Sequence, residues 1–253
     1  MISDEVPSDK EDVRTPISVT VSSHRLIRTI FFYLLGFEFL LVFLDATVNY
    51  GEWTSIGAIR RLFNVTREDS LQNWFSSAQT LFVGLVLWLV FLRVKRDDLW
   101  KGRGWALLAV FFTYLATDDG AQIHERVGTA VKVSGLAQSF PSYTWHLVFD
   151  PFFGAMGLFI LTFVWRELKD HTLRSLLMLG LGCYVIKVGL DFVEGLDNGY
   201  ESLAEALALS PEPVRHFGMV LEEFLKMLGS TLFLVCFLKH FVRISPFFSI
   251  RFK

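Results

Sequence analysis

Long apolar blocks are the feature that most constrains the fold of this chain. Residues 81–90 read Leu-Phe-Val-Gly-Leu-Val-Leu-Trp-Leu-Val without a charge, and blocks of this character recur along the 253 residues. A helix of about 20 apolar residues crosses the hydrocarbon core of a bilayer, which is about 30 Å thick. The sequence therefore predicts an all-α, polytopic integral membrane protein with six transmembrane helices in one bundle. The predicted spans are residues 26–49, 71–94, 104–119, 143–165, 173–194 and 214–241.

The distribution of positive charge predicts how these spans are oriented. Lys and Arg concentrate before the first span, after the second and fourth spans, and after the last span. Cytoplasmic loops of membrane proteins carry such an excess, so we expect both termini in the cytoplasm. Residues 1–24 form a polar N-terminal tail, residues 25–243 the transmembrane domain and residues 244–253 a basic C-terminal tail. The expected location of this multi-pass protein is the inner (plasma) membrane of a bacterium.

Composition limits the partners. The net charge of −2 argues against binding to nucleic acid, which requires a positive surface. Cys183 and Cys236 both lie within apolar runs, which indicates small buried side chains rather than a disulfide framework or a Cys-x-x-Cys metal site. The expected partners are membrane lipid and, within the membrane, a partner protein or a second copy of the chain.

The predicted topology places the unusual polar residues at one depth. The third span ends in the stretch Thr117 to Arg126, which contains two adjacent aspartates, a histidine and a glutamate. Ionisable groups in a membrane are costly unless they pair, bind an ion or face water, and they therefore mark functional sites. The predicted outer group draws on all six spans and consists of Asp45, Gln72, Asn73, Asp118, Asp119, His124, Glu125, His146, Asp150, Asp191, Glu194, His216, Glu222 and Glu223.

Residue type and spacing within this group favour a metal site. His146 and Asp150 are four residues apart, and His216 and Glu223 are seven apart, so each pair shares a helix face. Neutral imidazole and carboxylate are ligands of zinc and iron, and such a divalent metal is the expected cofactor. The chain has no His-Glu-x-x-His motif. The predicted metal ligands are His124, His146, Asp150, His216, Asp118 and Glu194, and the predicted catalytic carboxylates are Glu125 and Glu223.

The leading functional hypothesis is an intramembrane metal-dependent hydrolase that acts on a lipid or lipid-linked substrate at the outer leaflet. The metal would activate water, and a carboxylate would act as the base. One alternative is a non-enzymatic subunit that binds haem or pigment, or packs within a larger complex. Another is a transporter that uses the acidic outer cluster as its access site.

The ligand types are similar to those of the alkaline ceramidase and adiponectin-receptor class of membrane hydrolases, which hold zinc with three histidines and an aspartate. The chain departs from that class in having six predicted spans rather than seven. It also lacks a Ser-x-x-x-His motif on the second predicted span, where Ser76 and Ser77 are followed by Gln79 and Thr80. The resemblance covers ligand type only, so we infer no membership of that class.

Some of these residues also have structural interpretations. Lys187 and Asp191, and likewise Glu222 and Lys226, are four residues apart and are predicted to pair within their helices. Glu38 lies near the middle of the first span without a local cation, so we expect it to be neutral or bonded to another helix.

The stretch that ends the third span has two interpretations. If the helix continues, Asp118 and Glu125 share a face that excludes His124, and only part of the stretch faces the cavity. The alternative is a break of the helix at Gly120. We expect Asp118 and Glu125 to face inward.

Overall fold

The computed structural model describes residues 23–133, 144–196 and 198–245, and these residues form an all-α structure. The N-terminal tail of residues 1–24 therefore lies almost entirely outside the described residues, as does the C-terminal tail from residue 246. In chain order the elements are α1 (Ser23–Leu44), the π-helical segment η1 (Asp45–Tyr50), α2 (Gly57–Phe63), α3 (Leu71–Val94), α4 (Leu99–Ala121), α5 (Ile123–Val133), α6 (Thr144–Phe159), the π-helical segment η2 (Ile160–Val164), α7 (Trp165–Glu167), α8 (His171–Gly195), α9 (Gly199–Leu207) and α10 (Pro211–Ile244).

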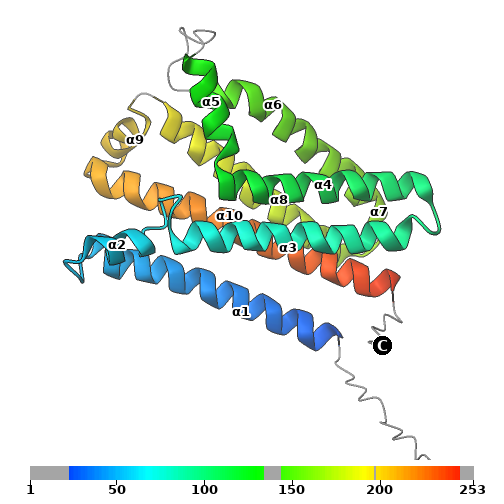
Figure 1. Cartoon of the computed structure of the whole chain (residues 1–253). Coiled ribbons are helices and arrows are strands. Elements are labelled where there is room, and N and C mark those ends of the chain that lie inside the picture. The colour runs from blue at the N-terminus through cyan, green and yellow to red at the C-terminus, as the bar shows by residue number, and fades with distance from the viewer. Residues whose placement is uncertain (1–22, 134–143, 197, 246–253) are drawn as a thin grey trace, which may run out of the picture.

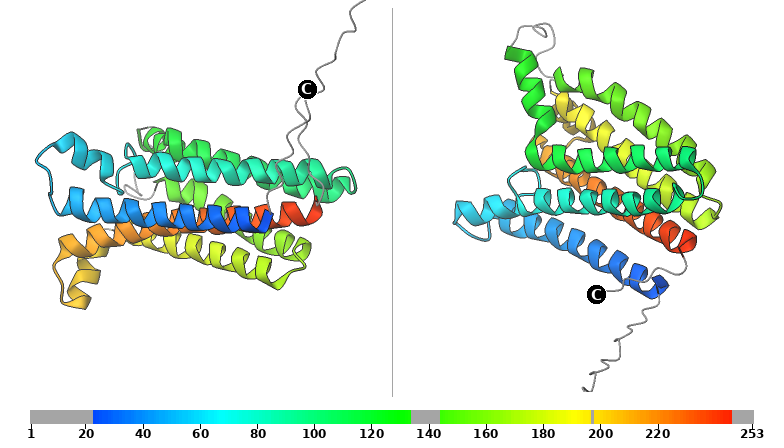
Figure 2. Two further views of the ribbon diagram at one scale, coloured as in Figure 1. Left: turned by 90° about the horizontal axis from the view of Figure 1, so that it is seen from below. Right: turned by 45° about the vertical axis from the view of Figure 1, so that its right-hand side comes forward.

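The long helices lie roughly side by side in one bundle with two different ends (Figure 1). At one end lie α2, α9 and the start of α5, and we call this the α9 end. At the other end, tight turns join α3 to α4 and α7 to α8, and we call this the tight-turn end. The first residue of α1 and the last residue of α10 both lie at the tight-turn end, as the second set of views also shows (Figure 2).

Within the described residues, three helical segments are long and apolar enough to cross a membrane: Ser23–Tyr50, Leu71–Val94 and His171–Glu194. They correspond to the predicted first, second and fifth spans, and they indicate a membrane protein. The other predicted spans also fall on helices, but these helices differ from the prediction in their bounds or their continuity. The fourth predicted span covers α6, η2 and α7 in succession, and the third begins earlier than expected, at Leu99.

Short polar caps explain why the chain turns so tightly between helices. The Ser70 hydroxyl accepts a hydrogen bond from the backbone N–H of Asn73 at the start of α3. The Asp98 and Asp170 carboxylates cap α4 and α8 in the same way. Such side chains satisfy backbone donors that the first turn of a helix leaves free, and each contributes about 1 kcal/mol. Each capped helix can therefore begin a few residues after the preceding helix ends, and the two helices then run antiparallel.

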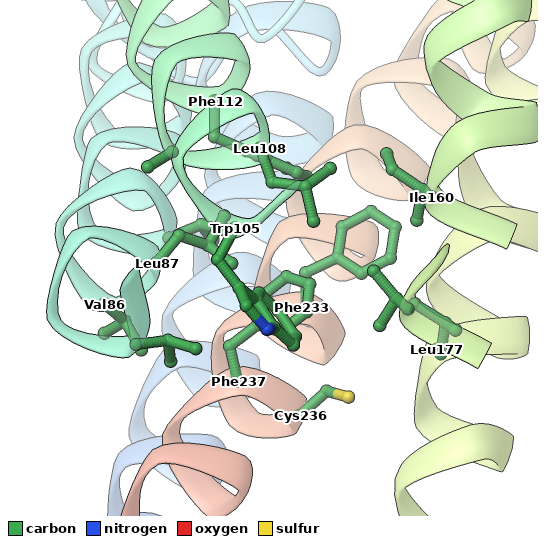
Figure 3. Packing of buried hydrophobic residues seen from close by; sticks show 14 of the residues in the cluster. Val86, Leu87, Trp105, Leu108, Phe112, Ile160, Leu177, Phe233, Cys236 and Phe237 are labelled. Atoms are coloured by element: carbon green, nitrogen blue, oxygen red, sulfur yellow. The ribbon is translucent and has the colours of Figure 1, made fainter. Parts of the chain in front are cut away.

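The helices pack around an apolar core in which α10 is central. Trp105, Phe112, Phe233 and Phe237 are all almost completely buried. Figure 3 shows Phe233 and Phe237 of α10 between the side chains of α3 and α4 on one side and those of Ile160 and Leu177 on the other. α10 therefore contacts most of the long helices, and its polar side chains can meet partners on several of them.

Candidate functional site

The break between α4 and α5 brings His124 to Asp118. Gln122 ends α4 with a φ of 57°, in the left-handed region. The chain changes direction there, and the His124 backbone N–H donates to Asp118 Oδ1 at 2.9 Å. The His124 ring Nδ1 lies 2.9 Å from Asp118 Oδ2. The interpretation with a helix break is therefore correct, although the break lies at Gln122 rather than at Gly120. The expectation that Asp118 faces inward is confirmed, since its side chain is only 6% exposed.

A second His–Asp pair joins α10 to the end of α1. His216 Nε2 lies 2.8 Å from Asp45 Oδ2, and the two side chains are 14% and 1% exposed. The Tyr50 ring stacks on the His216 imidazole with centroids 4.4 Å apart. Asp45 is the first residue of η1, and π-helical turns of this kind are frequent at functional sites.

Asp45 is also a structural anchor for the connection between α2 and α3. Its Oδ1 accepts hydrogen bonds from Asn49 Nδ2 at 2.9 Å and from the Val65 backbone N–H at 3.1 Å. In the same connection, a hydrogen bond from Arg61 and a weaker effect of the one from Arg67 lower the pKa of Asp69 to about 2. The Asp45 carboxylate thus accepts hydrogen bonds on one oxygen and pairs with the imidazole on the other, so its position is tightly fixed.

Deeper between the helices, Lys226 connects α10 to α3 and α4. Its Nζ lies 2.7 Å from Glu223 Oε2 and 3.1 Å from Asp119 Oδ1. Gln72 Nε2 donates to Glu223 Oε2 at 2.6 Å, and the Ser77 hydroxyl donates to Asp119 Oδ2 at 2.7 Å. We call these five residues the Lys226 cluster. Glu223, a predicted catalytic base, is thus held by a cation and an amide.

A parallel group, the Lys187 cluster, joins α8 to α10. Lys187 Nζ lies 2.9 Å from Asp191 Oδ2 and 3.0 Å from Glu222 Oε1. The predicted pair of Lys187 and Asp191 is confirmed. The predicted pair of Glu222 and Lys226 is wrong, because each residue pairs across a helix interface instead.

Below these clusters the polar contacts continue toward the middle of the bundle. Tyr184 Oη lies 2.8 Å from the Ser230 hydroxyl, which lies 3.2 Å from Thr80 Oγ1. Glu38 is completely buried, and it accepts hydrogen bonds from Gln79 of α3 and Thr231 of α10. The expectation that Glu38 is bonded to another helix is confirmed.

The predicted metal ligands lie in separate groups where the structure describes them. His124 pairs with Asp118, His216 pairs with Asp45, and Glu194 lies half-buried in the last turns of α8. Among the described residues, no three His, Cys, Asp or Glu side chains are grouped so that they could hold a metal. His146 and Asp150 lie on α6 and Glu125 on α5, but their side chains are outside the described part. The shared metal site therefore stays a prediction.

The chemistry of the α9 end combines fixed imidazoles with an excess of negative charge. In the Lys226 and Lys187 clusters, two lysines face four carboxylates. Partly buried carboxylates that outnumber their cations attract protons and cations. A histidine oriented by a buried carboxylate can accept a proton or bind a metal through its other ring nitrogen. The arrangement thus suits acid–base chemistry or cation binding.

Comparison with known proteins gives a family for most of the chain. A family model described as a domain of unknown function, DUF8692, matches residues 33–241, from the first half of α1 to the last turn of α10. No curated protein and no solved structure matches the chain.

The Lys226 cluster makes a direct prediction about stability. Lys226→Met leaves Glu223 and Asp119 without their cation, and breaking a buried ion pair costs about 3–5 kcal/mol. Because these side chains are 14–22% exposed, we expect a loss of about 2–4 kcal/mol. The free energy of unfolding is measured by SDS titration of the detergent-solubilised protein.

Two variants serve as controls for this measurement. Lys101→Met removes a half-exposed lysine at the tight-turn end and should cost under about 1 kcal/mol. The double variant Lys226→Met with Glu223→Gln should recover part of the loss, since it removes one of the stranded charges. Equal losses for Lys226→Met and Lys101→Met would show that the cluster is not a buried ion-pair network.

Proposed function

We propose a function for this chain, which belongs to the family DUF8692: it is a multi-pass membrane hydrolase that acts on a lipid or lipid-linked substrate at the α9 end of the bundle. The observation that carries the proposal is the contact between His216 and Asp45. This imidazole combines a buried orienting carboxylate with a position near the start of α10, at the α9 end of the bundle.

The contact with Asp45 determines which ring nitrogen of His216 can accept a proton or bind a metal. A carboxylate at Nε2 holds a proton on that nitrogen, so Nδ1 keeps its lone pair. Nδ1 makes no hydrogen bond to any residue within the described part of the chain. It is therefore the nitrogen that takes a proton from an attacking water or binds a metal, while Asp45 stabilises the imidazolium that forms.

A divalent metal, zinc or iron, is the proposed cofactor. Its candidate ligands are the histidines of the two His–Asp pairs, with carboxylates behind them in the manner usual for metal-binding histidines. When bound, such a metal would lower the pKa of a water molecule and so supply the nucleophile. His146, Asp150 and Glu194 complete the proposed ligand set, and Glu125 is the proposed carboxylate base. Glu223 is less suited to that role, because Lys226 and Gln72 already engage it.

For the topology we propose six crossings, with the tight-turn end and both termini in the cytoplasm and the α9 end outside. Support comes from the basic residues at the tight-turn end, such as Arg93, Lys95 and Lys101, which follow the positive-inside rule. α2 has exposed Ile59 and Leu62 beside arginines at the α9 end, which suits a helix lying in the membrane interface.

Reporter fusions test this topology. Alkaline phosphatase, which folds only outside the cytoplasm, should be active when fused after Gln138 and inactive when fused after Lys101. Activity at Lys101 with none at Gln138 would reverse the proposed orientation.

The enzymatic proposal predicts a change in cellular lipids. The full chain is expressed in bacterial cells, and the extracted lipids are compared by mass spectrometry. We expect a lipid to be depleted and its hydrolysis product to accumulate, with a rate lowered about 10²- to 10⁴-fold by His216→Ala or Asp45→Asn, the usual contribution of an acid–base residue. His171→Ala at the tight-turn end is the matched control.

Element analysis of the same purified proteins tests the metal separately. About one zinc or iron per chain is expected in the wild type, with less in His216→Ala, because one ligand is lost. Lipid profiles that are identical for cells with the wild type, His216→Ala and no protein would contradict the hydrolase. Absence of metal beside a retained lipid change would exclude only the metal.

A second candidate is a non-enzymatic subunit, and the two lysine clusters favour it. Their ion pairs cross helix interfaces and hold neighbouring helices together, as in a purely structural bundle. An absorption band of haem or pigment, or a stable partner protein in place of any lipid change, would support this function. A transporter is less favoured, because an apolar core fills the space between α3, α4 and α10 toward the tight-turn end.

A further inference from the structure

Glu38 is a second buried acidic centre, separate from the proposed hydrolytic site. Its Oε1 accepts a hydrogen bond from Gln79 Nε2 at 2.8 Å and another from Thr231 Oγ1 at 2.6 Å. Gln79 Nε2 also donates to Thr231 Oγ1 at 2.8 Å. Three helices, α1, α3 and α10, therefore meet at one carboxyl group that has no exposed surface.

Two oxygens at this meeting point, Glu38 Oε2 and Gln79 Oε1, have no hydrogen-bond partner among the described residues. Each oxygen shares its carbon with the atom that makes the hydrogen bond between Gln79 and Glu38, so the two oxygens belong to one small region. A buried acceptor without a hydrogen bond destabilises the folded state. A single proton on Glu38 Oε2 would remove both costs, because the resulting O–H can donate to Gln79 Oε1. Acid and amide would then exchange a pair of hydrogen bonds.

The charges around Glu38 also favour a bound proton. Glu38 takes part in no ion pair with the residues described, and the groups that face it from α3 and α10 are the neutral Gln79 and Thr231. On α8, Cys183 interacts with it electrostatically but carries no positive charge. The nearest lysine along α10, Lys226, is engaged by Glu223 and Asp119. An ionised Glu38 would therefore be a buried charge without a counter-ion.

A metal ion fits this position less well than a proton. The Gln79 amide and the Thr231 hydroxyl direct hydrogen-bond donors at the carboxyl, whereas a cation requires acceptors around it. Two unpartnered oxygens are enough for one shared proton but fall short of the six or more ligands of a hard cation.

Further unpartnered atoms connect this centre to the α9 end. Gln72 Oε1 and the Ser76 hydroxyl are also buried without a partner in the described part of the chain, and residues 72, 76 and 79 share one face of α3. Gln72 belongs to the Lys226 cluster, so this face leads from that cluster to Glu38. Polar atoms of this kind commonly bind buried water, which can carry a proton to and from solvent.

We propose that Glu38 is a proton-binding site that makes the contact of α1 with α3 and α10 sensitive to pH. At neutral pH the carboxyl holds a proton from solvent water and bonds to the Gln79 amide. At alkaline pH the proton returns to solvent, and the remaining charge weakens the packing of α1. The proposal is independent of the hydrolase, because it uses none of that site's residues.

Infrared spectroscopy of the full-length protein in detergent tests the proton directly. The wild type at neutral pH should show the C=O stretch of a protonated carboxylic acid, and Glu38→Gln should lack that band. Gln79→Leu should shift the band to higher frequency, because the acid loses its amide partner. Glu205→Gln, on the exposed surface of α9, is the control and should leave the band unchanged. A wild-type spectrum without a Glu38-dependent band would overturn the proposal.

Thermal unfolding as a function of pH tests the consequence. In Glu38→Gln, an amide N–H can donate to Gln79 Oε1 in place of the acid O–H, and it does not ionise. The unfolding midpoint of the wild type should therefore fall relative to that of Glu38→Gln as the pH rises from neutral to alkaline. A constant difference between the two midpoints would show that no proton leaves Glu38 and would contradict the pH-sensitive contact.

Discussion

A charged side chain between apolar helices is stable only when a partner on another helix neutralises it, and this constraint shapes the α9 half of the bundle. The side chains of Lys226 and Lys187 are 14% and 19% exposed. Each binds one carboxylate on its own helix and one on a neighbour. Breaking such a pair leaves an uncompensated charge in a medium that solvates it poorly. The clusters therefore fix α3, α4 and α8 against α10 at defined depths.

The two halves of the bundle are therefore stabilised by different kinds of contact. Toward the tight-turn end, Trp105, Phe233 and Phe237 give a core of aromatic contacts without ion pairs between these residues. In the α9 half, hydrogen bonds and ion pairs replace these contacts and leave acceptors with unfilled capacity. A rigid apolar support beneath a polar region is a suitable frame for a site, because it fixes the positions of His216 and Asp45 on two different helices.

The sequence predicts the parts of this structure that depend on local spacing. The apolar blocks coincide with helices, and the pair of Lys187 and Asp191 forms as expected, because residues four apart on a helix are neighbours. The same rule fails for Glu222 and Lys226, since Lys226 finds Glu223 and the distant Asp119 instead. Local spacing cannot rank a neighbour on the same helix against one on another helix.

Contacts between distant residues left no signal in the sequence. His216 and Asp45 are 171 positions apart, and only the packing of α10 against α1 brings them together. The left-handed Gln122 determines the position of His124, yet glutamine rarely adopts that conformation and nothing local indicates it. The nearby Gly120 suggested a break, but not where the break lies. Asp45 belongs to the predicted outer group but not to the predicted ligands or catalytic residues, because its contact with the distant His216 leaves no local pattern.

The central claim is that Asp45 orients His216 with a proton on Nε2, toward the carboxylate, and with Nδ1 available for chemistry. Nitrogen-15 NMR of histidine-labelled protein at neutral pH measures this directly, with the signal of His216 assigned by its loss in His216→Gln. The account predicts a protonated Nε2 and an unprotonated Nδ1, with this preference lost in Asp45→Asn. A proton on Nδ1, or on both nitrogens, would contradict it.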